Sequence, residues 1–151
     1  MTNKEQLTAK LDALIDSYHA MGTGPEELHN MLAVRRDIAV TCYSLSSYVK
    51  ETHGKAGLSN LQRKWITAKA IVDARNMDAK VKPTPMNVLE VQAQQLPEVV
   101  KAHQDEIMAE SEKEALKTKL QFATQVLSSL MQELSVLSSE AKTAHFQNAQ
   151  S

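Results

Sequence analysis

Residues 116–140 read "LKTKLQFATQVLSSLMQELSVLSSE", and this stretch decides the architecture of the 151-residue chain. Apolar residues recur in it at alternating intervals of four and three, which places them along one side of a helix. They are Leu116, Leu120, Ala123, Leu127, Leu130, Leu134 and Leu137. Between Pro97 and Ala144 there is no further Gly or Pro. The sequence therefore predicts a helix over 97–144, far longer than the average of about 12 residues.

Two interpretations of this heptad pattern are open. Three sustained heptads are typical of a coiled-coil seam between copies of a chain. The same pattern also fits a core stripe that packs against earlier helices of the same chain. Phe122, Val126 and Met131 widen the apolar surface beyond a two-position seam, so the helix is predicted to serve an intrachain core, an oligomer contact, or both.

The remainder of the chain also favours helices. Only four Gly and four Pro occur, and aromatic residues make up 4%, which disfavours a fold of many short turns. A first helix is indicated by an apolar face with three- and four-residue spacing, made of Leu7, Leu11, Leu14, Ile15 and Tyr18. "MGTGPEEL" (21–28) ends it, and Pro25 followed by two Glu residues starts a second helix that runs to Gly54.

A third helix is predicted from Ser59, which forms a capping-box pattern with Gln62. Its apolar face is predicted to be Leu61, Trp65, Ala68, Val72 and Ala79, and "KVKPTP" (80–85) ends it. A short helix over 86–95 follows, with Thr84 as cap and Pro85 as first residue. The chain is thus expected to be one all-α domain over 1–151, a helical hairpin or bundle. Its parts are three helices within 1–82, a proline-containing connector with a short helix in 83–96, and the long helix 97–144.

Few features of the sequence suggest catalysis. His19, His29, His53, His103 and His145 are dispersed without metal-ligand spacing, and no nucleotide-binding glycine loop occurs. We therefore predict no enzyme, no catalytic residue, no metal and no cofactor. The lone Cys42 falls within an apolar helical pattern and is interpreted as a small buried side chain in a reducing, cytoplasmic protein. No apolar run is long enough for a membrane span.

The net charge of −1 conceals a local excess of positive charge. Residues 54–82 carry seven basic and two acidic side chains, a balance of +5. The seven are Lys55, Arg63, Lys64, Lys69, Arg75, Lys80 and Lys82. Clustered cations displace the counterions of a nucleic acid, and Trp65, the only Trp, could stack on an unpaired base. Because Trp65 follows the apolar stripe, a place in the core is the favoured interpretation. If the heptads assemble several copies, the basic helices are multiplied along one strand.

Two segments resemble the recombination mediator proteins of T4-like bacteriophages, the UvsY family. "LQRKWITAKAIVDAR" (61–75) is similar to the basic helix of that family, and residues 116–140 are similar to its C-terminal oligomerisation helix. The resemblance covers roughly residues 30–140. It implies a homo-oligomer that binds single-stranded DNA (ssDNA) without sequence preference and helps to load a recombinase on strands coated by a single-strand binding protein.

By this resemblance, Arg63, Lys64, Lys69 and Arg75 are expected to contact phosphate, as are Lys80 and Lys82, with Trp65 as a candidate stacking residue. The heptad residues of 116–137 are expected to form the oligomer seam. Many short helical phage proteins share the pattern. The alternative is therefore a virion component or assembly chaperone whose helices pack against protein partners and which binds no nucleic acid.

Overall fold

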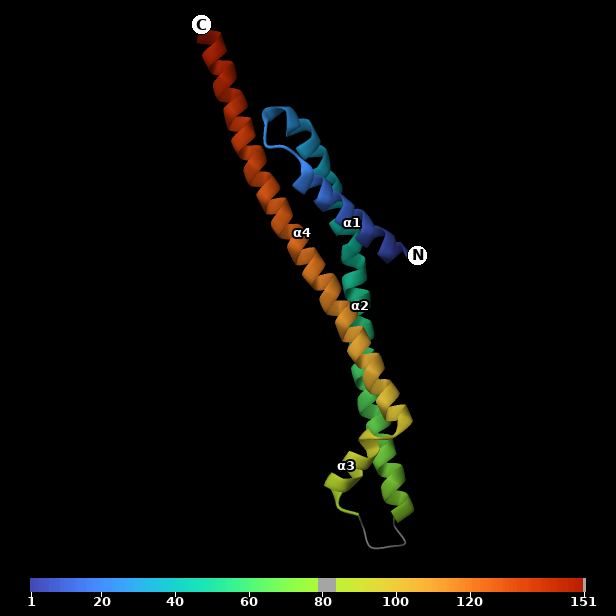
Figure 1. Ribbon diagram of the computed structural model, residues 1–151. Coiled ribbons are helices and arrows are strands. Elements are labelled where there is room, and N and C mark those ends of the chain that lie inside the picture. Colours follow the sequence, from blue (N-terminus) through green and yellow to red (C-terminus); the bar gives the residue numbers. More distant parts are fainter. Residues whose placement is uncertain (79–83, 151) are drawn as a thin grey trace. The chain divides into compact units, whose positions relative to one another are not determined.

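The computed structural model describes residues 1–78 and 84–150, and within them the chain is almost entirely helical. The elements are α1 (Asn3–Ala20), the 3₁₀ turn η1 (Pro25–Glu27), α2 (Leu28–Asp78), α3 (Met86–Gln94) and α4 (Pro97–Gln150). The all-α prediction with a long C-terminal helix is confirmed (Figure 1). No helix in the described ranges combines the length and apolar character needed to cross a bilayer.

The chain divides into two compact units. Unit 1 holds Met1–Tyr48 and Lys117–Ser151, and unit 2 holds Val49–Leu116. Each unit therefore takes one part of α2 and one part of α4. The prediction of a single domain stays a prediction.

Unit 1 is built on three helical segments. The predicted face of α1 is confirmed, because Leu11 and Ile15 are buried and the other members of that face are half-buried. Asn3 in α1 donates to the Tyr48 hydroxyl at 3.0 Å, which pairs the start of α1 with the last unit-1 residue of α2. The Lys119 ammonium of α4 lies 2.8 Å from an Asp12 oxygen of α1.

The heptad residues of α4 belong to the core of the chain itself. Leu116, Ala123, Leu130, Leu134 and Leu137 are buried, and Leu120 and Leu127 are half-buried. Except for Leu116, they lie in the same unit as the buried Leu11, Ile38 and Leu45. The core-stripe interpretation is therefore the one that the structure shows. Five of the seven side chains are thus covered within the chain, and their assignment to an oligomer seam stays a prediction.

Unit 2 pairs α2 with α4 and places α3 at one end. Lys55 bonds to Glu112 at 3.2 Å and Asn60 bonds to Glu106 at 2.7 Å, so the two helices run antiparallel. Ala70 of α2, Ala93 of α3 and Val99 of α4 form a buried cluster, against which Ile66 and Ile71 pack. Small side chains at these positions allow the helix backbones to approach closely.

The predicted break between the second and third helices is wrong. α2 continues for 51 residues through Gly54, Gly57 and Ser59, and neither Gly has a positive φ. Each Gly costs a helix about 1 kcal/mol relative to Ala. The buried side chains of Thr52 and Ala56 beside them keep this part of α2 packed, and tertiary burial outweighs that cost.

The helix boundaries around the proline-rich connector differ from the predicted ones by only a few residues. α3 begins at Met86, and the carbonyl of Pro85 at the cap position accepts the N–H groups of Val88 and Leu89 at 3.1 Å each. Pro85 is therefore the cap and not, as predicted, the first helical residue after a Thr84 cap. Pro97 does start α4, which extends past the predicted end at Ala144 to Gln150.

Candidate nucleic-acid interface

The candidate interface lies on the part of α2 that belongs to unit 2. This part packs through Ala56, Ile66 and Ala70, which are buried or half-buried. The predicted apolar face is on the opposite side. The Leu61 side chain is 63% exposed, Trp65 is 64% exposed, and Ala68 and Val72 are exposed as well.

The prediction that Trp65 lies in the core is therefore wrong. Seven residues separate Ala56 from Arg63 and Arg63 from Ala70, so these three residues define the side of α2 that faces α4. Trp65 follows Arg63 by two residues, which on a helix is a rotation of about 200°. The size of Leu61, Trp65 and Val72 favours their burial, but the packed side of α2 carries smaller residues. Here alanines make the close helix contact and the bulky residues remain outside.

Three of the predicted phosphate contacts border this outer stripe. Lys64 and Arg75 are exposed and eleven residues apart, which places them within about 20° of each other on one flank. Lys69 is exposed on the other flank, and its ammonium lies 5.5 Å from the centre of the Trp65 ring. A cation at this distance is attracted by the electron-rich ring face. The outer stripe thus presents one aromatic ring among three cations.

Arg63, predicted to contact phosphate, instead faces the inside of unit 2. Its guanidinium donates to Glu106 of α4, and the two side chains are only 26% and 14% exposed. Glu106 also accepts from Asn60, and its carboxylate lies 3.9 Å from the Nδ1 atom of His103. The hydrogen bond from Asn60 and the ion pair with Arg63 lower the pKa of Glu106. Arg63 is thus part of the fold and is removed from the candidate site.

The other basic residues of 54–82 do not join the candidate site, for two different reasons. Lys55 is paired with Glu112, which reduces its availability for phosphate. Lys80 and Lys82, like Ala79 of the predicted apolar face, lie outside the described residues. The candidate site is therefore Lys64, Trp65, Lys69 and Arg75.

Elsewhere in the described ranges, no group of three His, Cys, Asp or Glu side chains is placed to hold a metal ion. Cys42 is half-buried and not fully buried as predicted, and burial raises the pKa of its thiol. A scan of family models, a search of curated proteins and a search of solved structures found no match to this chain.

Proposed function

We propose that this chain is a non-enzymatic ssDNA-binding protein that uses the outer face of α2 in unit 2. The observation that carries the proposal is the exposed Trp65 ring with the Lys69 ammonium 5.5 Å from its centre. Stacking of an unpaired base on an aromatic side chain contributes about 1–3 kcal/mol per base and tolerates any sequence. In this proposal Lys64, Lys69 and Arg75 bind the phosphates on either side of that base, and their exposure next to Trp65 supports it.

By its resemblance to the recombination mediators, the chain would act as a homo-oligomer that assists a recombinase on strands coated by a single-strand binding protein. The buried heptad does not support this oligomer. The DNA-binding proposal therefore rests on the four residues of one copy. Three phosphate contacts on a single strand correspond to a salt slope of about −2, or about a twentyfold loss of affinity for a fourfold rise in salt.

Because Trp65 is the only Trp in the chain, its fluorescence is a direct test. Addition of a dT oligonucleotide should quench it, with a midpoint that moves to higher DNA concentration as salt rises. Replacement of Lys64 and Lys69 by Ala should weaken binding at least about tenfold, by removal of two cations. The matched control replaces the exposed Lys101 and Lys117 by Ala and should leave the titration unchanged. The proposal would be refuted if the oligonucleotide did not quench the fluorescence at low salt. It would also be refuted if both double variants lost the same amount of affinity for the oligonucleotide.

The second candidate function is the protein-docking role, and one observation favours it. Leu58, Leu61 and Val72 are exposed in line with Trp65, and aliphatic side chains contribute little to binding a nucleotide. An apolar line with three- and four-residue spacing suits a partner helix. This is the function of a structural or assembly protein.

Two substitutions separate the candidates. Trp65→Leu keeps the apolar line and removes the stacking ring, so it should reduce DNA binding and spare helix docking. Leu58→Ser with Leu61→Ser keeps Trp65 and the cations, so it should spare DNA binding. If Trp65→Leu binds DNA as the parent chain does, stacking is excluded.

A further inference from the structure

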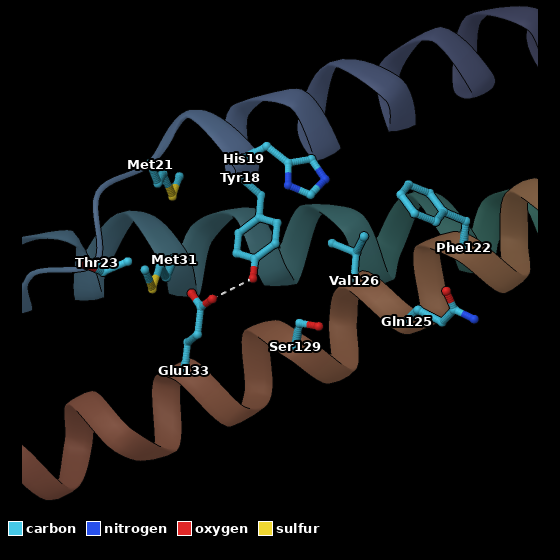
Figure 2. Close-up of a pocket in the computed structure, with 10 residues that line it drawn as sticks. All are labelled: Tyr18, His19, Met21, Thr23, Met31, Phe122, Gln125, Val126, Ser129 and Glu133. Atoms are coloured by element: carbon cyan, nitrogen blue, oxygen red, sulfur yellow. Dashed lines mark hydrogen bonds between the residues drawn. The ribbon is translucent and has the colours of Figure 1, made fainter.

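A groove lies in unit 1, and none of its lining residues belongs to the candidate DNA site. It consists of two hollows of about 390 and 410 Å³, which share Thr23, Met31 and Glu133 as lining residues. Figure 2 shows the first hollow, with side chains contributed by the end of α1, the segment that follows it, the start of α2, and α4. The second hollow continues along α4 to Glu140. Because the two hollows share three lining residues, they are neighbours, and together they are called the unit-1 groove.

The lining of the groove combines apolar and polar side chains. Met31 is buried beneath it, and Met21 and Val126 line its side. Phe122 at one end and Val136 toward the other are exposed. Methionine is unbranched and adapts to the shape of what packs on it, which makes it frequent in surfaces that receive amphipathic helices.

The charge in the groove is negative. Glu133 and Glu140 are seven residues apart and thus lie on the same side of α4, two helical turns or about 10 Å from each other. The lining residues, all in the described part of the chain, include no Lys or Arg. An anionic occupant such as a nucleic acid would be repelled here, and a cationic one would be attracted.

Glu133 is held in place. The Tyr18 hydroxyl donates to it at 2.9 Å, and burial together with this bond raises the pKa of Tyr18 to about 12 (Figure 2). The phenol is protonated at neutral pH and is the donor of this bond. A carboxylate has about four acceptor sites, so Glu133 still has capacity for a partner's ammonium or guanidinium group.

We infer that the unit-1 groove docks a basic amphipathic helix of a partner protein, with its apolar face on Met21, Phe122 and Val136 and two cations opposite Glu133 and Glu140. The lining on α4 extends from Phe122 to Glu140, about 27 Å of helix. That length accommodates a partner segment of about 18 residues. Cations spaced by seven residues on the partner match the spacing of the two carboxylates.

The test uses the full chain with ¹³C-labelled methionine methyl groups and a synthetic 18-residue helix that carries a Leu stripe and two Lys seven residues apart. We expect saturable binding in which the methyl signals of Met21 and Met31 shift. The signals of Met77 and Met108, both exposed in unit 2, should not move. A peptide with Glu in place of Lys should bind at least about tenfold more weakly. Shifts spread over all methionines, or equal binding of both peptides, would overturn the inference.

A matched pair of variants isolates the two carboxylates. The double variant Glu133→Gln with Glu140→Gln keeps a side-chain acceptor for the Tyr18 hydroxyl. Its affinity for the Lys peptide should be lower than that of the parent chain by at least about tenfold. Asp105→Asn with Glu114→Gln removes the same charge from exposed positions of unit 2 and should leave the affinity unchanged. Equal losses in the two variants would overturn the inference.

Two other occupants are distinguished by separate measurements. If light scattering shows a dimer that Phe122→Ser with Val136→Ser dissociates, a second copy fills the groove and the inference is overturned. It is also overturned if a dT oligonucleotide shifts the Met21 and Met31 signals as the peptide does.

Discussion

The guanidinium of Arg63 donates to the carboxylate of Glu106 and so joins α2 to α4 within unit 2. The Asn60 amide bonds to the other oxygen of the same carboxylate at 2.7 Å. Both oxygens of Glu106 thus receive hydrogen bonds from α2, at a place that is mostly shielded from water. Arg63 contributes to stability, whereas its neighbour Lys64 points to solvent.

Arg63→Ala should therefore destabilise the chain more than Lys64→Ala does. Its removal leaves Glu106 with one hydrogen-bond partner fewer and an uncompensated charge, which is the costly way to break such a pair. Thermal unfolding followed by circular dichroism should show a lower Tm for Arg63→Ala and a nearly unchanged Tm for Lys64→Ala. In DNA titrations Lys64→Ala should lose more affinity than Arg63→Ala, which is the reverse of the order expected for stability. A lower affinity for Arg63→Ala at full helix content would return Arg63 to the interface.

The same carboxylate should make stability depend on pH on the acidic side. Hydrogen bonds from Asn60 and Arg63 lower the pKa of Glu106 below its ordinary value of 4.5. The folded state then holds its proton less tightly than the unfolded state, so the contribution is complete above the unfolded pKa and is lost as pH falls through the folded pKa. The Tm difference between the parent chain and Glu106→Gln should shrink as pH decreases from 7 to 3. A constant difference would mean that the charge of Glu106 is irrelevant to folding.

Much of the fold could be predicted from the sequence because its helices have regular apolar spacing. The face of α1, the turn at Pro25 and the start of α4 at Pro97 all carry local signals that agree with the packing. The break at Gly54 was predicted wrongly, since the Gly residues and a capping pattern are local signals that tertiary burial overrode. Local signals also could not decide whether the heptad of α4 packs within the chain or between chains.

The candidate site was harder to predict because two opposite faces of α2 both look plausible. One carries large apolar residues such as Leu61 and Trp65, and the other carries alanines and Arg63. The spacing of Ala102 and Ala109 in α4, with Glu106 between them, was the signal that could have identified the alanine face as the packed one. A charged residue inside a row of small ones suggests a partner on the facing helix, and Arg63 and Asn60 supply it.

Because the heptad residues lie in the core, shortening one of their side chains should cause a large loss of stability. Leu130 is fully buried, so Leu130→Ala should lower the free energy of unfolding by about 2–5 kcal/mol. Its neighbour Met131 is 55% exposed, and Met131→Ala should change stability by no more than about 0.5 kcal/mol. Urea denaturation measures both values. Dissociation of an oligomer by Leu130→Ala, without loss of helix content, would instead support the seam interpretation.

The continuity of α2 can be tested at its two internal glycines. Nothing lies within 4 Å of a Cβ placed on Gly54 or Gly57, and both have ordinary helical backbone angles. Ala at either position should therefore stabilise the chain by about 0.5–1 kcal/mol, because Ala loses less conformational freedom than Gly in a helix. Denaturation of Gly54→Ala, Gly57→Ala and the double variant should show increments that are close to additive. If the helix instead ended at Gly54 in a left-handed turn, Ala there would be strained, and the same measurement would show destabilisation.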